Sequence, residues 1–412
     1  MSGLFSRGDK ALILAALADT RVVFILGARQ VGKSTLAHQI AERDHPAQIV
    51  NLDSKGPREA AIADPEGFIA ALPRPVLIDE VQRGSADLLL AIKATIDEDL
   101  SPGQFLLTGS ANVLRNKKVS DALTGRVEMV QLWPLAQAEI EGSSNNFVDA
   151  LFAASPPQVE KAPKGRAALA DRIVAGGYPE ARVRSGNRQA RWFQSYLRTT
   201  FEKDLETISD AHKLHEMPRL LRLLASQAAN LFVPANLSRR LDLDHRTVAS
   251  YVGMLETIYL VKRIPAWRPG LGQREVQTSK IYVVDSGLLL YLLGADEERL
   301  TNDDQITDKA LENFVAMEII KHAEWSEIAP QVYHYRRGSE EVDLVLENRA
   351  GEIAAVEVKG RVSLQSKDWR ALEKLRDKRG SDFKCGVVIH TGSQTIPLGD
   401  RLFAVPLSGL WA

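Results

Sequence analysis

Short apolar runs alternate with helical patterns along the first third of the chain. The apolar runs are RVVFIL (Arg21 to Leu26), QIVNL, PVLID, QFLLT and VEMVQL. Continuous apolar runs of this length are typical of parallel strands that are covered by helices on both faces. The pattern therefore predicts one doubly wound α/β domain over residues 1–155.

The pattern changes three times after this domain. Residues 142–165 are rich in Pro, Ser and Gly without periodicity, which predicts a connector or a mobile loop. Helical spacing then dominates to about residue 259, and after an acidic, turn-rich segment a helix precedes three strand-like runs, a helix and two strands. We expect a helical lid over 166–230, a helix-turn-helix unit over 231–293 and a separate α/β domain over 305–412.

Composition and charge exclude several classes of protein. The formal net charge of −1 gives no overall attraction to nucleic acid or anionic lipid, so such contacts need a local patch. The single cysteine, Cys385, excludes an internal disulfide and a cysteine zinc cluster, and fits a reducing compartment. No apolar run approaches the roughly 20 residues that span a bilayer, and the first residues lack a signal-peptide pattern. We expect a cytoplasmic protein without a membrane span.

The segment GARQVGKST follows the first apolar run and has the spacing of a P-loop. Glycines without a Cβ let backbone N–H groups surround phosphates, and a helix beginning at Lys33 adds its positive end. We expect Lys33 to contact the β and γ phosphates of ATP and Ser34 to bind Mg²⁺. The strand before and the amphipathic helix after argue against a chance glycine turn. The expected nucleotide-binding residues are Gly27, Ala28, Arg29, Gln30, Val31, Gly32, Lys33, Ser34 and Thr35.

A second motif, PVLIDE, places two carboxylates at the end of a buried strand. Asp79 is expected to bind the metal ion and Glu80 to activate the attacking water. An acidic pair at a strand end is often only a helix cap. Its position after a P-loop favours the catalytic role, so the two motifs together predict ATP hydrolysis.

These motifs resemble those of AAA-type and related signalling P-loop ATPases of bacteria and archaea. The segment QFLLTGSAN places Thr108, Ser110 and Asn112 at the end of another strand. The resemblance implies that a polar residue there senses the γ phosphate, and of the three we expect Ser110. It also implies an arginine finger that acts on a neighbour's nucleotide, which LTGRVEMVQL places at Arg126, and hence a homo-oligomer. A surface arginine that caps a helix C-terminus is an equally good interpretation of Arg126.

The segment AGGYPEA looks like the Gly-x-Pro signature of lids that contact bound nucleotide, which implies contacts from Gly177 and Pro179. Together with YLRTTFEKDL (Tyr196 to Leu205), it is similar to a widespread prokaryotic group of AAA-superfamily ATPases. In that group the C-terminal half carries a domain of unknown function. The similarity spans nearly the whole chain and implies a P-loop parallel sheet with a helical lid.

Residues 233–264 predict a short helix, a polar turn and a longer helix. The second helix is expected to present five side chains to a DNA major groove, namely His245, Arg246, Thr247, Ser250 and Tyr251. A basic hairpin follows and resembles the wing of a winged helix that contacts phosphates, with Lys262, Arg263, Arg268, Arg274 and Lys280. Winged helices also serve as packing or protein-contact modules, and both interpretations stay open.

The last domain contains Asp343 on one predicted strand and Glu357 with Lys359 on the next, joined by a turn at Asn348 to Gly351. Residues two apart on a strand share a face, so a hairpin brings the three side chains together. With Glu312 on the preceding helix, this order resembles the PD-(D/E)xK nuclease superfamily, a restriction-endonuclease-like α/β fold. The resemblance implies Mg²⁺ on the carboxylates and Lys359 as the cation that orients water.

The sequence therefore predicts an ATP hydrolase that requires Mg²⁺ and couples its nucleotide state to the binding or processing of DNA. One alternative is a slow signalling switch that binds a protein partner and carries an inactive nuclease-like domain. Another is a metal-dependent nuclease that its ATPase loads onto DNA.

Overall fold

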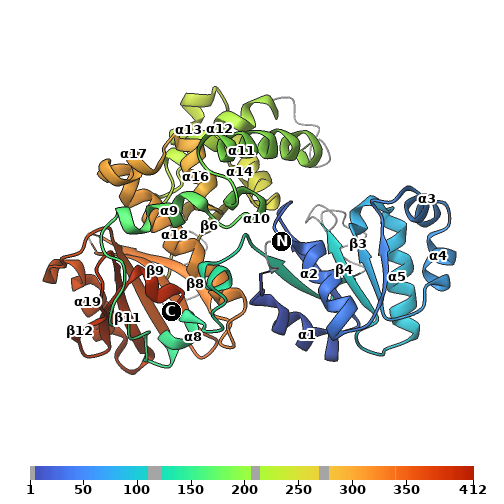
Figure 1. The fold of residues 1–412 in the computed structure, drawn as a ribbon, viewed down its shortest axis with the longest axis horizontal. Coiled ribbons are helices and arrows are strands. Elements are labelled where there is room, and N and C mark those ends of the chain that lie inside the picture. The colour runs from blue at the N-terminus through green and yellow to red at the C-terminus, as the bar shows by residue number, and fades with distance from the viewer. Residues whose placement is uncertain (1–4, 110–122, 206–213, 269–277, 339) are drawn as a thin grey trace.

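The computed structural model describes residues 5–109, 123–205, 214–268, 278–338 and 340–412. In Figure 1 the blue N-terminal unit and the orange and red C-terminal unit lie at opposite ends of the view, with a helical unit above and between them. Each of the two end units is built around its own sheet. This confirms the expectation of an α/β chain with a separate C-terminal α/β unit.

The N-terminal unit is a five-stranded parallel sheet with helices on both faces (Figure 1). The strand order is β2-β3-β4-β1-β5, and every pair is parallel. Its strands are β1 (Val22–Gly27), β2 (Gln48–Asn51), β3 (Val76–Asp79), β4 (Phe105–Gly109) and β5 (Val127–Leu132). Its helices are α1 (Asp9–Asp19), α2 (Lys33–Gln39), η1 (Ile40–Asp44), α3 (Lys55–Ala63), α4 (Pro65–Ala71), η2 (Val81–Arg83) and α5 (Ala86–Glu98).

Alternation along β1 supplies two separate cores. Val23 and Ile25 belong to the core that includes residues of α1 and α2, whereas Val22 and Phe24 belong to the core that includes α5. All six residues of β1 are buried. A strand that is covered on both faces reads as a continuous apolar run, which is why the sequence pattern located this sheet. The loop after β1 is thereby held on a rigid support.

The helical unit follows β5. Helix α7 (Gln137–Glu141) and helix α8 (Phe147–Phe152) come before this unit, and α8 packs on the C-terminal unit. The first helices of the helical unit are α9 (Ala167–Ala175), α10 (Pro179–Arg182), α11 (Gly186–Thr200), η4 (Phe201–Leu205), η5 (Leu214–Glu216) and α12 (Met217–Ser226). The rest are α13 (Pro234–Leu241), α14 (His245–Thr257), β6 (Val261–Ile264), β7 (Lys280–Val283), α16 (Ser286–Leu293) and α17 (Glu297–Asn302). Helices α13 and α14 pack together, and β6 and β7 form an antiparallel pair.

The C-terminal unit is a mixed six-stranded sheet in the order β12-β13-β11-β10-β9-β8. Its strands are β8 (Gln331–Arg337), β9 (Glu340–Glu347), β10 (Ile353–Lys359), β11 (Phe383–His390), β12 (Ile396–Gly399) and β13 (Leu402–Pro406). Its helices are α18 (Asp304–Glu324), η6 (Ser366–Asp368), α19 (Arg370–Arg379), η7 (Gly380–Asp382) and η8 (Leu407–Leu410). Val356 packs in the core with α18, while Ala355 packs in the core with α19.

Residues 156–165, which we name the strap, run along the C-terminal unit (Figure 1). Val159 O accepts a hydrogen bond from Thr395 N at 2.8 Å, and Gly165 N donates to Thr391 O at 2.8 Å. Just before the strap, α8 packs against β11 and α18. The Pro-rich stretch that the sequence predicted as a connector or mobile loop is therefore bonded in place along the C-terminal unit.

Candidate functional site

The phosphate-binding loop joins β1 to α2. Gly27, Gln30 and Gly32 have positive φ angles of 156°, 64° and 99°. A Cβ atom on Gly27 would lie 2.2 Å from the carbonyl oxygen of Leu132 on β5, so only glycine allows this close approach. The loop therefore turns tightly and ends at the N-terminus of α2, where the positive end of the helix dipole favours an anion.

Lys33, Ser34 and Asp79 meet at the end of this loop. The Lys33 side chain is buried, and its Nζ donates to the carbonyl oxygens of Gly27 at 3.1 Å and Ala28 at 2.8 Å. Ser34 Oγ donates to Asp79 Oδ1 at 2.8 Å. A hydroxyl next to a carboxylate supplies the oxygen ligands that Mg²⁺ prefers. These residues therefore fit a magnesium ion carried by bound ATP.

Thr108 links the two carboxylate residues. It lies on β4, is fully buried, donates its hydroxyl to Asp79 Oδ1 and accepts from Glu80 N at 3.1 Å. Glu80 has a left-handed backbone with φ 58°, and its carboxylate accepts a hydrogen bond from Gln82. Ser110, which we expected as the sensor, lies outside the described residues. Thr108, two positions earlier, is the polar residue of this strand end that contacts both carboxylate residues.

His38 is a neighbour of Asp79 that the motifs did not reveal. Its Nε2 lies 3.6 Å from Asp79 Oδ2. His38 follows Ser34 by four residues on α2, and residues four apart share a helix face. The four-residue spacing from Ser34 could have indicated His38 in the sequence. It places the imidazole beside Asp79, the expected metal ligand.

A cleft of about 790 Å³ belongs to the C-terminal unit, and a second cleft of about 730 Å³ lies at the P-loop. The expected P-loop residues that line the second cleft are Arg29, Gln30, Gly32, Lys33, Ser34 and Thr35. Ala28 and Val31 are buried in the core instead. Of the two lid residues that the resemblance implied, Pro179 lines this cleft.

Gly177 has a different environment from the one we expected. Its N–H donates to Asp285 Oδ2 at 2.6 Å, and a Cβ there would lie 2.3 Å from the carbonyl oxygen of Leu135. Gly177 is not among the residues that line the P-loop cleft. Close packing explains the glycine, because any side chain would collide with the backbone of residue 135.

Helix α11 supplies a wall of the P-loop cleft that the motif reading did not assign. The lining residues on α11 are Trp192, Ser195, Tyr196, Thr199 and Thr200, and Lys203 of the following η4 also lines the cleft. The rings of Trp192 and Tyr196 are stacked, with centroids 5.1 Å apart and planes 5° apart. Four residues of the segment YLRTTFEKDL, namely Tyr196, Thr199, Thr200 and Lys203, thus line the P-loop cleft. The sequence signal for this was the similarity of the segment to the ATPase group rather than any chemical pattern.

Arg126 lies at the opposite end of the sheet from the P-loop. It directly precedes Val127, which pairs with Val22 at the start of β1, whereas the P-loop follows the end of β1. Its guanidinium forms an ion pair with Asp97 on α5, with Nε 2.6 Å from Oδ1. Arg126 is therefore remote from its own nucleotide site, and a role on a neighbour's nucleotide stays a prediction.

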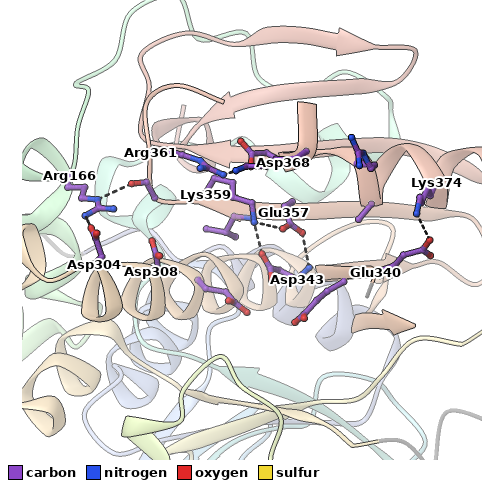
Figure 2. Close-up of a pocket in the computed structure, with 17 residues that line it drawn as sticks. Arg166, Asp304, Asp308, Glu340, Asp343, Glu357, Lys359, Arg361, Asp368 and Lys374 are labelled. Carbon is purple, nitrogen blue, oxygen red and sulfur yellow. Dashed lines mark hydrogen bonds and ion pairs between the residues drawn. The ribbon is translucent and has the colours of Figure 1, made fainter. Parts of the chain in front are cut away.

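The β9–β10 hairpin brings Asp343, Glu357 and Lys359 together, as Figure 2 shows. Lys359 Nζ donates to Glu357 Oε1 at 2.5 Å. Asp343 Oδ2 accepts from Val358 N at 2.9 Å, and Asp343 N donates to Glu357 Oε2 at 3.4 Å. These side chains and Glu312 of α18 line the 790 Å³ cleft. The strand pairing that we inferred from one turn is thus present.

Lys280 enters the same cluster from β7. Its Nζ lies 2.8 Å from Glu312 Oε1, 2.9 Å from Glu341 Oε1 and 3.1 Å from Asp343 Oδ1. Only 2% of the Lys280 side chain is exposed. The expectation that Lys280 belongs to a phosphate-contacting wing is therefore wrong, because the lysine is buried between carboxylates of the other unit.

Burial changes the protonation of this cluster. Burial, reinforced by the Asp343 carboxylate, raises the pKa of Glu312 and that of Glu357 to about 8, although Lys280 and Lys359 oppose the shifts. Burial also acts to lower the pKa of Lys280, but Asp343 and the other surrounding acidic groups outweigh it and raise the pKa above its usual range. The Lys280 ammonium therefore stays charged at neutral pH.

The predicted metal set of Glu312, Asp343 and Glu357 needs a correction. Among the residues that the structure describes, no three His, Cys, Asp or Glu side chains form a group that could hold a metal ion. The physical reason is visible in the contacts, since the lysine nitrogen lies between Glu312 and Asp343. The residue types match a metal site, but a protein cation is placed among them.

Helix α14 begins with Asp244 as its cap, whose carboxylate accepts from Arg246 N and Thr247 N. His245, Arg246 and Ser250 are exposed, which suits a surface contact. Tyr251 is buried, so it does not face a groove as we expected. The helical spacing alone could not separate the outward face from the packed one.

The basic hairpin is also less available than the sequence suggested. Arg263 forms an ion pair with Glu256, and Lys262 lies over the ring of Trp133 at 5.8 Å. Arg274 lies outside the described residues.

In the described part of the chain, no helix is long and apolar enough to cross a membrane.

Three family models match successive parts of the chain. Residues 19–141 match the model described as "AAA domain". Residues 166–299 and 307–410 match two models that are each described as a domain of unknown function, DUF8612 and DUF4143. The AAA match covers the parallel sheet and its P-loop, and the DUF4143 match covers most of the C-terminal unit with its acidic residues.

Two curated relatives are uncharacterized proteins of Mycobacterium bovis and Mycobacterium tuberculosis. Each is 29% identical over 409 residues, which is 98% of this chain and 84% of the relative. Among solved structures, the Thermotoga maritima RuvB Holliday junction branch migration motor matches 63% of this chain and 90% of its own, at 15% identity and a TM-score of 0.31. The Drosophila ORC bound to AT-rich DNA and Cdc6 matches 69% and 90%, at 10% identity and a TM-score of 0.20.

Structural likenesses at these scores carry no conclusion about this chain. The family match and the geometry of the loop are independent of them. Gly27, Lys33, Ser34 and Asp79 lie together at the loop, and their residue types fit a site for phosphate and magnesium. The AAA domain match over residues 19–141 and this P-loop geometry together support a P-loop ATPase of the AAA type.

Proposed function

We propose that this protein hydrolyses ATP in a reaction that requires Mg²⁺. The observation that carries the proposal is the convergence of Lys33, Ser34, Asp79 and Glu80 at one P-loop, with Thr108 bonded to both Asp79 and Glu80. Magnesium, when bound with the nucleotide, neutralises charge on the phosphate oxygens.

Each side chain has a separate task in this proposal. Lys33 binds the β and γ phosphates, and Ser34 with Asp79 holds the magnesium ion. Glu80 lines the cleft and accepts a proton from the attacking water. Pro179 and the α11 face line the cleft on the lid side, where they would shield the bound phosphates from bulk water.

The finer part of the proposal is that the nucleotide state controls binding of DNA by homo-oligomers. The support is the helix pair α13–α14 followed by the β6–β7 pair, with His245, Arg246 and Ser250 exposed on α14. Arg126, at the far end of the sheet, would act on the nucleotide of a neighbouring protomer.

The direct test is steady-state ATP turnover by the purified protein, alone and with single-stranded, duplex and forked DNA. Lys33→Ala should abolish turnover, and Glu80→Gln should lower it by about 10²–10⁴-fold while ATP still binds. Turnover equal in the parent and Lys33→Ala would refute hydrolysis at this site.

Turnover measured with DNA distinguishes coupling to DNA from the alternative of a switch that binds a protein partner. Stimulation by DNA that is lost in Arg246→Ala supports coupling to DNA. Turnover that ignores every DNA form contradicts the coupling and favours a switch that binds a protein partner, in which case Glu80→Gln should trap one assembly state without DNA.

A further inference from the structure

The side chain of Lys280 lies among three carboxylates of the C-terminal unit, those of Glu312, Glu341 and Asp343, which we name the acidic centre. Lys280 lies on β7, within the segment that matches DUF8612, whereas Glu312, Glu341 and Asp343 lie in the segment that matches DUF4143. A lysine with 2% of its side chain exposed and three carboxylate partners is a fully desolvated cation. Such an ion is stable only where its partners remain in place.

Several carboxylate oxygens of this centre already have hydrogen-bond partners from the protein. Glu312 Oε1 accepts from Lys280 and from the Tyr282 hydroxyl at 3.1 Å. Asp343 Oδ1 accepts from Lys280, and its Oδ2 accepts from Val358 N. Mg²⁺ requires about six oxygen ligands in near-octahedral geometry, so it would have to displace these donors.

The strand that carries Lys280 is fixed on α18. Asn313 Oδ1 accepts from Val283 N at 2.8 Å, and Asn313 Nδ2 donates to Val283 O at 2.8 Å. Further along the same strand, Ile281 N donates to Asn230 O at 3.1 Å. Because Asn313 and Glu312 are adjacent on α18, the contact that fixes the strand also fixes the lysine beside its partner.

We infer that Lys280 is the resident cation of this centre and takes the place of a divalent metal ion among Glu312, Glu341 and Asp343. The native C-terminal unit then binds neither Mg²⁺ nor Mn²⁺ through Asp343. A metal-dependent nuclease step at these residues does not fit the structure. This inference does not depend on the proposed ATP hydrolysis, which uses other residues.

The test measures Mn²⁺ binding to full-length protein without nucleotide, from the electron paramagnetic resonance signal of free Mn²⁺. Five proteins are compared: the parent, Asp343→Asn, Lys280→Met, the double variant Lys280→Met with Asp343→Asn, and Lys280→Arg as a control that keeps the charge. Two differences are taken: the parent minus Asp343→Asn, and Lys280→Met minus the double variant. Each difference isolates the Mn²⁺ binding that requires Asp343, so any Mn²⁺ bound at Asp79 cancels.

The parent and Asp343→Asn should bind Mn²⁺ equally. Lys280→Met should bind it at least about tenfold more tightly than the parent, because the competing cation is gone, and the double variant should lose this gain. Lys280→Arg retains the positive charge and should behave like the parent. Tighter binding by the parent than by Asp343→Asn would overturn the inference, as would folded Lys280→Met without any gain.

Thermal melting checks whether the variants are folded. Lys280→Met leaves the carboxylates without their cation and should melt at a lower temperature than the parent. Added Mn²⁺ should restore part of the difference in Lys280→Met, but should not stabilise Lys280→Arg. If Lys280→Met does not fold, the comparison of the parent with Asp343→Asn alone still decides the matter.

Discussion

Thr108 is a single hydroxyl that serves two carboxylate residues. It donates to Asp79 and accepts from the backbone of Glu80. Thr108→Val keeps the shape but removes both hydrogen bonds, each of which contributes about 1 kcal/mol. We expect kcat for ATP to fall about tenfold or more while KM changes little.

The matched control for this variant is Thr108→Ser, which keeps the hydroxyl and should retain most of the parent kcat. Steady-state kinetics of both variants at saturating Mg²⁺ make the comparison. Equal losses in the Ser and Val variants would show that packing of the methyl group, rather than the hydroxyl, matters at this position.

Glu357 makes a second residue-scale prediction. Its pKa in the folded protein is raised to about 8, mainly by burial, from an ordinary value of 4.5. A raised pKa means that the folded state holds an extra proton between these values, so its contribution to stability is lost as pH rises toward and through 8. The free energy of unfolding should therefore fall between pH 6.5 and 8, and less steeply in Glu357→Gln.

Urea unfolding at several pH values checks this. Burial lowers the folded pKa values of His322 and His334 to about 3 and about 4. These histidines titrate near 6.5 in the unfolded chain, so they add a slope of opposite sign at the lower end of the window. That slope is common to the parent and Glu357→Gln and cancels in their comparison. An identical pH slope in the parent and Glu357→Gln would contradict the raised pKa.

Single residues also show how far sequence reasoning reached. The pairing of Asp343 with Glu357 and Lys359 followed from one turn and the two-residue period of strands. Lys280 was placed in a wing because its neighbours in the sequence are basic. Its actual partners are 32 and 63 residues away, and no local pattern encodes a charge pair between two units.

Helix α11 provides a prediction at the scale of an element. Its residue Trp192 lines the P-loop cleft, so ATP binding should change the environment of this indole. We expect a saturable change in tryptophan emission on addition of Mg-ATP. Lys33→Ala should abolish the change. The chain has 6 tryptophans, and Trp192→Phe identifies the signal, because that variant should bind ATP without it. A full signal in Trp192→Phe would assign the change to another tryptophan.

Elements differed in how well the sequence predicted them. The parallel strands were found because burial on both faces leaves an uninterrupted apolar run, as in β1. The ordered course of the strap was not predicted, because proline and serine specify little local structure. The strap is held by hydrogen bonds to distant residues of the C-terminal unit, such as Thr395. The prediction that Tyr251 faces a DNA groove was wrong because residue type alone was not decisive. A tyrosine suits a packed face of α14 as well as an exposed one.

The strap supplies a prediction for the whole molecule. Val159 N donates to Thr395 Oγ1 at 3.1 Å, and Thr395 Oγ1 donates to Pro157 O at 2.8 Å. Thr395→Val removes both bonds, and hydrogen exchange at Val159 should become about tenfold faster. Mass spectrometry of the peptide that covers the strap measures this. Thr395→Ser should exchange like the parent, and fast exchange in the parent itself would show that the strap is not bonded in solution.

The same strap sets an order of events during synthesis. Val159 and Thr395 are 236 residues apart, so at about 5–20 residues per second the strap leaves the ribosome on the order of ten seconds to a minute before its partner is made. Over that interval the apolar face of α8, with Phe147 and Leu151, has no β11 or α18 to cover it. The C-terminal unit therefore folds after its last strands have been translated, and the apolar face of α8 stays uncovered until then.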